Sequence, residues 1–533
     1  MSVHERESEP RIHAAGASCH SHQEKTAGEI SRRGLLGGLG GVAALGGAAL
    51  VSASTAQATT TRPAPPTALA GGSPLRVKPA LVYQLYERKE NTSWRMYGGL
   101  HTREDVDQEA KRIEEELKSL AAKADFALEI LPVSLVGSDA EAAAVKDSDG
   151  DVILVYASGG AETWLETLAS SKKPNVMFLR HRSGPFYLGY ETVHWRFLRK
   201  KEDTFAEPNM DVWDIVVDDY DEVLWRLRAL YGLKNALGTK VAAIGGLQAY
   251  SRPGGINGPE HARNVWKYEI NSIPVEEVAR RLDKARADKK VLQQAERQTE
   301  ALLAERGVSL QTDKQAVVNT FLALGVFKEI MSETGATNLG VANCMGGLIG
   351  ILRTPPCLVL SLLNDEGMTA FCHVDMTHTV PGVLLRHISG KPSFICNTHF
   401  PHDGIITLAH CAAPRRMNGR DNEPTRIMTH FESDSGAATK VEYPKGQVIT
   451  ILISNVRCTK WIGLRGKIID SPSYDICRSQ MDVEIDGDWR KLLTDMQGFH
   501  AVTCYGDYLR EVGYVLKKLK IEWENVSERP SCA

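Results

Sequence analysis

The sequence predicts an α/β protein: two open parallel-sheet, Rossmann-like domains followed by a C-terminal antiparallel β domain that is barrel-like and carries a terminal helix. Two observations predict this fold. Up to about residue 366, apolar strand patterns alternate with helical patterns, which is typical of a parallel sheet with helices on both faces. After His410, short alternating runs are separated by Gly, Pro and Asn, which favours an antiparallel barrel.

The first 58 residues predict a twin-arginine export leader. Arg32 and Arg33 directly precede an apolar run rich in Gly and Ala, and Ala56-Gln57-Ala58 has the small-x-small pattern of a cleavage site. The run is too short and too rich in Gly for a convincing transmembrane helix. We therefore expect a cleaved leader, no stable membrane anchor and a periplasmic or extracellular location; an uncleaved anchor is the alternative.

The elements after the leader follow in three groups. Residues 59–78, rich in Thr, Pro, Ala and Gly, predict a flexible linker. The first α/β domain is expected over 79–237, with strands at 80–85, 151–156 and 175–179 and helices at 104–122 and 219–237. The second is expected over 238–366, with a strand at 240–244, a long charged helix at 275–305 and another at 313–334. The β-rich domain, 367–533, is expected to end in a helix at 508–519.

Composition excludes several classes of function. The net charge of −3 gives no reason to expect nucleic acid as a partner. No GxGxxG or Walker pattern occurs, so we expect no nucleotide cofactor. Nine of the ten cysteines lie between Cys344 and Cys532, and this odd number argues against a disulfide framework. Cys357, Cys372 and Cys396 lie in apolar runs that resemble strands, so we expect them to be small buried hydrophobes.

Residues 343–411 hold six of the sixteen histidines and the strongest candidate chemistry. Cys372-His373-Val374-Asp375 follows a predicted strand. Because alternate residues of a strand share a face, His373 and Asp375 are expected to be able to bind one ion such as Mn, Fe, Co or Zn. A hydrogen-bonded His–Asp pair at the edge of a sheet is the alternative.

Other histidines extend this candidate site. His410 ends a buried strand, and a metal ligand and a satisfied core histidine are both open there. His500 begins a short apolar strand and has no evident structural need to be His. His399 and His402 lie in a polar loop whose Asp403-Gly404 pair signals a hairpin turn. His181 follows a predicted strand; we take it, His399 and His402 as candidate substrate contacts.

The order of several short motifs resembles that of the L-fucose/L-arabinose isomerase-like family. The matching pieces are Pro356-Cys357, Leu363-Asn364-Asp365-Glu366-Gly367, Cys372-x-x-Asp375, Gly390-Lys391-Pro392-x-Phe394, His410-Cys411 and the closing Gly498-x-His500 with Tyr505-Gly506-Asp507. The resemblance implies a homo-oligomer in which a divalent metal, usually Mn, holds two adjacent oxygens of an open-chain sugar while acidic residues move a proton between C1 and C2. It implies that Asp375 and His500 bind the metal.

Two positions depart from that family. Gly347 stands where the family has its first catalytic glutamate, and His373 replaces a second glutamate. The remaining set of Asp375, His373, His410 and His500 is rich in nitrogen, which suits Zn or Fe better than Mn. Proton transfer would then fall to Asp375, Asp365 or His410, with Glu366 as a further choice.

The sequence therefore predicts an exported, metal-dependent, sugar-isomerase-like enzyme that interconverts an aldose and a ketose or acts on a related small carbohydrate. A non-catalytic carbohydrate-binding protein that kept the isomerase fold is the alternative from another class. An unrelated metal-dependent lyase or hydrolase is a third hypothesis, for which the sequence offers no evident base.

Overall fold

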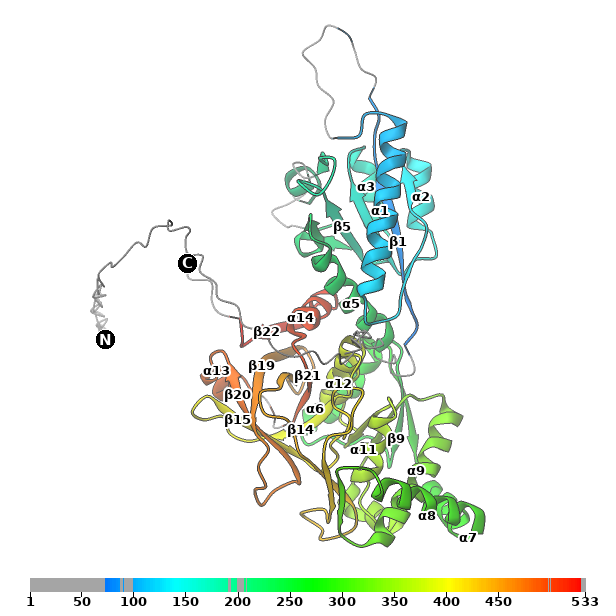
Figure 1. Cartoon of the computed structure of the whole chain (residues 1–533), viewed down its shortest axis with the longest axis vertical. Coiled ribbons are helices and arrows are strands. Elements are labelled where there is room, and N and C mark those ends of the chain that lie inside the picture. Colours follow the sequence, from blue (N-terminus) through cyan, green and yellow to red (C-terminus); the bar gives the residue numbers. More distant parts are fainter. Residues whose placement is uncertain are drawn as a thin grey trace, which may run out of the picture. The chain divides into compact units, whose positions relative to one another are not determined.

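The computed structural model describes residues 72–86, 90, 99–189, 193–198, 206–207, 209–496, 498 and 500–528. The predicted leader and most of the predicted linker lie outside the described residues. The range Pro63–Ala533 forms one compact unit, drawn in Figure 1. Its first strand, β1, begins at Leu75, so regular structure starts within the stretch predicted to be linker.

The first sheet is parallel throughout, with the strand order β2-β1-β4-β5-β8 and β3 paired to the far half of β1. All six residues of β4 are buried, as expected of a strand covered on both faces. One face packs on α1 and α5, and the other on α2, α3 and η1. The elements are β1 (Leu75–Val82), α1 (Arg103–Lys123), β2 (Leu128–Ile130), β3 (Ser134–Val136), α2 (Asp139–Lys146), β4 (Val152–Ala157), α3 (Glu162–Ala169), β5 (Asn175–Leu179), η1 (Val193–Leu198), β6 (Ala206–Glu207), β7 (Met210–Asp211), η2 (Val212–Asp214), β8 (Ile215–Val217) and α5 (Tyr220–Ala236).

The second sheet is also parallel, in the order β10-β9-β12-β13. Its last strand, β13, begins at Thr369, beyond the domain boundary predicted at residue 366. The elements of this region are β9 (Lys240–Ile244), α6 (Arg252–Asn264), β10 (Glu269–Ile273), α7 (Val275–Ala287), α8 (Lys289–Leu303), β11 (Val308–Gln311), α9 (Lys314–Thr334), β12 (Asn338–Val341), η3 (Cys344–Leu348), α10 (Ile349–Leu352), α11 (Cys357–Asp365) and β13 (Thr369–Cys372).

Two predictions in this region were wrong. The long helix expected over 275–305 is two helices, because Asp288 accepts hydrogen bonds from the N–H groups of Lys290 and Val291 and so caps the start of α8. Cys357 lies on the buried helix α11 rather than in a strand. Every residue of α11 is buried, and a short run that is apolar on all sides shows neither helical nor strand periodicity.

The C-terminal region contains a closed antiparallel barrel of six strands, as predicted. The order is β18-β21-β14-β15-β20-β19, and β18 pairs with β19 to close it, while β22 adds in parallel to β19. The elements are β14 (Phe394–Thr398), β15 (Ile405–His410), β16 (Thr425–Met428), β17 (Ala438–Val441), β18 (Val448–Ser454), β19 (Lys460–Asp470), β20 (Ser479–Asp486), α13 (Arg490–Asp495), β21 (His500–Tyr505), α14 (Leu509–Lys518) and β22 (Glu522–Asn525). A small separate sheet joins β16 and β17 to β11.

Helix α12 (Met376–Ser389) connects the second sheet to the barrel. All of its residues except Thr377 are buried, and it contacts α5, α6, β18 and β21. A helix that is covered on every side belongs to the core. Its first turn follows β13 and its end, at Gly390, is in the left-handed conformation that stops a helix.

The stability of the fold should fall below neutral pH partly because of His387 on α12. Burial lowers the pKa of this imidazole to about 3. Between about pH 6.5 and 3 only the unfolded chain takes up a proton there, so the folded state loses ~1.4 kcal/mol per pH unit. We expect His387→Gln to reduce the decline in unfolding free energy between pH 6 and 5 by about this amount in urea titrations. Equal declines in the two proteins would contradict the prediction.

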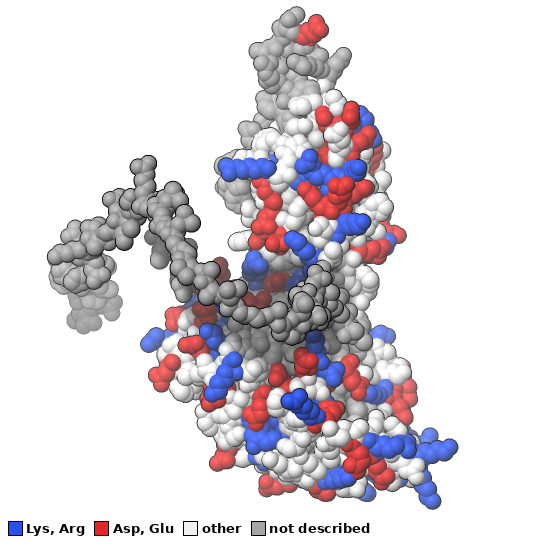
Figure 2. All heavy atoms as spheres, in the orientation of Figure 1, with Lys and Arg blue, Asp and Glu red and all other residues white. Residues whose placement is uncertain are grey.

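The described surface carries mixed charge. Lys and Arg side chains are interspersed with Asp and Glu over the face shown in Figure 2. Among the described residues no single helix is long and apolar enough to cross a bilayer; the bent pair Cys344–Leu352 and Cys357–Asp365 meets that test only jointly.

Candidate metal centre

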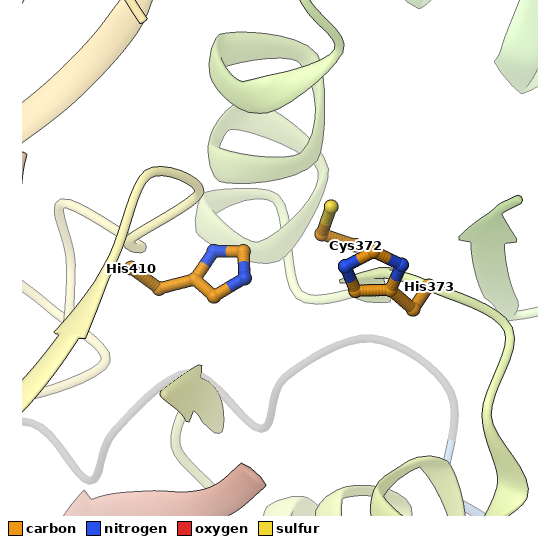
Figure 3. A group of neighbouring side chains, drawn as sticks. All are labelled: Cys372, His373 and His410. Atoms are coloured by element: carbon orange, nitrogen blue, oxygen red, sulfur yellow. The ribbon is translucent and has the colours of Figure 1, made fainter. Parts of the chain in front are cut away.

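Three side chains from two strand ends converge on one point. Cys372 is the last residue of β13, His373 follows it, and His410 is the last residue of β15. One ligand atom from each lies within 4.8 Å of the others. Figure 3 shows the two imidazoles approaching each other, with the Cys372 thiol beside them. This triad lies where β13, the edge strand of the second parallel sheet, comes close to the barrel strand β15.

The backbone at His373 explains how neighbouring residues can serve one site. The strand ends at Cys372, and His373 has a φ of 69°, in the left-handed region that is uncommon for residues other than Gly. Cys372 and His373 therefore both reach the site, although consecutive residues of a regular strand point to opposite faces. The expectation that His373 and Asp375 share a strand face was wrong, because neither residue is in a strand.

The ligand atoms of the triad are buried and polar. Cys372 is 4% exposed and His410 is 5% exposed. The Nδ1 atoms of His373 and His410 are buried, and within the described part of the chain neither has a hydrogen-bond partner. Leaving such an atom unsatisfied costs about 1–3 kcal/mol. A bound cation would offset that cost, so the residues present fit a metal.

The second nitrogen of His373 is held by an aromatic neighbour. The Tyr250 hydroxyl lies 3.0 Å from His373 Nε2 and forms a hydrogen bond with it. A hydrogen bond at one imidazole nitrogen orients the other toward a metal, and this arrangement is usual in metal sites. Nδ1 of His373 is therefore the atom best placed to bind an ion.

The donor set is soft. One thiol sulfur and two imidazole nitrogens suit Zn or Fe, whereas Mn prefers oxygen ligands. Three protein ligands leave a position open for water or substrate, as in catalytic zinc sites. The contact with Cys344, at an Sγ–Sγ distance of 3.8 Å, raises the pKa of the Cys372 thiol well above its usual value. Metal binding would therefore displace a proton from Cys372.

Further histidines surround the triad. The His500 ring centroid lies 5.6 Å from that of His373 and 5.2 Å from that of His378. Burial lowers the pKa of His378 to about 3 and that of His500 to about 2, and it lowers the pKa of His410 well below its usual value. These imidazoles are neutral near pH 7, the form that binds metals.

Asp375 has a structural role beside the site. One oxygen of its carboxylate accepts hydrogen bonds from the N–H and the hydroxyl of Thr377, which caps the start of α12. Its charge also raises the pKa of His373, against the larger effect of burial. It lines a cavity of about 40 Å³ together with Gln248 and Ala249. Asp375 is thus near the triad but is not one of its three members.

Replacement of Asp375 separates these roles. We expect Asp375→Ala to lower the free energy of unfolding by ~1 kcal/mol through loss of the helix cap, and to leave bound metal at the level of the unmodified protein. Asp375→Asn, which keeps a capping oxygen, serves as the control and should be near neutral. Calorimetry and elemental analysis would measure the two effects. Metal lost from both variants would instead make the carboxylate a ligand.

The remaining predicted site residues lie elsewhere. Asp365 is bound by Arg415, so its contacts belong to the core. His402 and Ile405 bridge a tight turn with positive φ at Asp403 and Gly404, which confirms the predicted hairpin. The His402 side chain is 68% exposed, and the backbone N–H of His399 bonds to Thr407. His181 belongs to the first α/β region, where its backbone N–H binds Asp218.

Sequence reasoning did not find several neighbours of the site. Cys372 was expected to be a buried hydrophobe, because alternation along a strand would direct it away from His373. Tyr250 precedes Gly254-Gly255 and Cys344 precedes Gly346-Gly347, and neither residue type by itself predicted a place beside the metal site.

Comparison with known proteins gives no relative from which to transfer a function: no protein-family model and no curated protein sequence matches this chain.

Proposed function

We propose that the protein is a metal-dependent enzyme that acts on a small carbohydrate and moves a proton between adjacent carbons, as an aldose–ketose isomerase does. The observation that supports this most strongly is the meeting of three distant motifs. Cys372-x-x-Asp375, His410-Cys411 and Gly498-x-His500 each resemble isomerase motifs, and the side chains of His373, His410 and His500 come together. Chance resemblance gives no reason for them to meet.

The chain's own groups would divide the chemistry. Cys372, His373 and His410 would hold the ion, which would supply a Lewis acid for two adjacent sugar oxygens. Neutral imidazoles with strongly lowered pKa values are weak bases, so a carboxylate is the better proton acceptor. Asp375 lines the cavity beside the site, and its charge raises the pKa of His373 against the larger effect of burial, so we propose Asp375 for the role that the missing family glutamates would fill.

One observation favours a non-catalytic carbohydrate-binding protein instead: Gly347 stands where the family has its first catalytic glutamate. The cavity beside Asp375, about 40 Å³, has room for water but not for a sugar. Either function therefore requires the segment around Gln248 and Ala249 to move when the sugar enters.

Exchange with solvent deuterium tests the proposal. The protein, loaded in turn with Zn²⁺, Fe²⁺ and Mn²⁺, would be incubated with a panel of aldoses and ketoses in D₂O, and deuterium at C1 or C2 detected by NMR. We expect incorporation that is lost in His410→Gln and kept in the surface control His101→Gln. Sugar binding without incorporation would identify the binding protein, and neither binding nor incorporation would reject both functions.

A further inference from the structure

A second group of charged side chains surrounds a cavity at the far end of α12. This cavity has a volume of about 410 Å³, within the range of small-molecule sites. Its charged lining residues are Asp125, Arg228, Arg386, Lys391, Arg420 and Asp421. Helix α12 starts beside the triad and ends in this cavity, so about 20 Å of helix separates the two sites.

The charges that line the cavity do not balance among the residues that the structure describes. Four cationic side chains there face two carboxylates. Arg228 already binds one of these, with 2.5 Å between Arg228 Nη2 and Asp125 Oδ1. Burial lowers the pKa of Lys391, and the positive charges of Arg228 and Arg420 lower it further. A concave site with surplus positive charge attracts anions.

Ordinary structural roles account for part of this charge. Arg386 lies in the last turn of α12, where cations stabilise a helix end. Lys391 Nζ donates to the Tyr505 carbonyl and the Tyr508 hydroxyl. Neither role accounts for Arg420. Its side chain forms no hydrogen bond or ion pair to the residues that the structure describes, although it lines the cavity.

The loop that carries Arg420 is held in place. The side-chain oxygen of Asn418 accepts hydrogen bonds from the N–H groups of Arg420 and Asp421. Phe126 and Tyr231 also line the cavity and supply an aromatic wall, with ring centroids 5.3 Å apart. Burial lowers the pKa of Arg386 to about 10 and also lowers that of Lys391, and a bound anion would favour the charged form of both.

We propose that this cavity binds an anionic sugar derivative, with Arg420, Arg386 and Lys391 around its carboxylate or phosphate and Phe126 and Tyr231 against its apolar face. Arginine forks suit both kinds of anion, and aromatic rings beside polar groups suit a polyol. The inference is independent of the metal triad and of the proposed isomerisation.

Calorimetric titration at low ionic strength tests this site, with gluconate, inorganic phosphate and glucose as probes. Gluconate binding identifies a carboxylate ligand, and phosphate binding identifies a phosphate ester. We expect Arg420→Gln to weaken the affinity for the probe that binds at least tenfold, and Arg420→Glu to abolish its binding. Arg306→Gln, at another exposed arginine, is the matched control and should bind as the unmodified protein does.

Three results would overturn the site. These are no binding of gluconate or phosphate, unchanged affinity in both Arg420 variants, and glucose binding as tight as that of gluconate, because the last would show that charge is not recognised. Arg420 is exposed, so its variants should fold; circular dichroism checks this. A triad variant that has lost its metal should keep its affinity for the anion, which separates this site from the proposed function.

Discussion

Replacing His373 with Asn should remove bound metal from the protein. Asn tolerates the left-handed backbone conformation that His373 adopts, so the variant deletes an imidazole with little added strain. A site with two of its three protein ligands should lose at least two orders of magnitude in metal affinity, since loss of outer-shell partners alone costs 10–100-fold. Elemental analysis of the purified variant would show sub-stoichiometric metal.

The control for this variant is an exposed histidine away from the triad. His402 is on the hairpin between β14 and β15, and its side chain is 68% exposed. His402→Asn should keep a full complement of metal and unfold at the temperature of the unmodified chain. If His373→Asn also kept its metal, then His373 would not be a ligand and the triad would be wrong.

Replacing Asp365 with Asn should cost about 1.5–3 kcal/mol of stability without changing the metal content. The Asp365 carboxylate accepts hydrogen bonds from Arg415 Nε at 2.8 Å, the Arg415 N–H at 2.8 Å and the Arg416 N–H at 3.0 Å. Asp365 is 5% exposed and Arg415 is 3% exposed. Asn at this position keeps one acceptor oxygen but removes the buried charge, and Arg415 keeps the Glu305 carboxylate, 2.9 Å from Arg415 Nη1, as its remaining ion-pair partner.

Denaturation in urea would measure this cost. The matched control is Asp283→Asn, which removes a surface ion pair to Arg286 in which the Asp283 side chain is 75% exposed; its effect should stay within ~0.5 kcal/mol. A destabilisation of Asp365→Asn no larger than the control's would contradict the account. Loss of metal from the same variant would restore Asp365 as a candidate for the active site.

The architecture was readable from the sequence because buried strands leave a local pattern. β4 and β9 are short apolar runs between turn signals, and the barrel strands alternate. The break at Asp288 and the helical state of α11 were missed since both depend on local hydrogen bonds or on burial from all sides. Pairing of β13 with β12 is a long-range property that residue patterns do not specify.

The candidate site was half predictable. His373 and His410 could be picked out because each follows or ends an apolar run, and that is where sheets expose polar groups. Cys372 could not, because strand alternation directs it away from His373 unless the strand ends between them. The strand ends there because His373 adopts the left-handed conformation, and a histidine does not by itself predict that conformation.

We infer that one sulfur and two imidazole nitrogens of this chain hold a metal ion, and X-ray absorption at the metal edge of the purified protein would measure these ligands. We expect one Zn or Fe per chain, with one sulfur at about 2.3 Å and two nitrogens near 2.0–2.1 Å in the zinc form. A shell of oxygen and nitrogen without sulfur, or no metal after incubation with each ion, would contradict it.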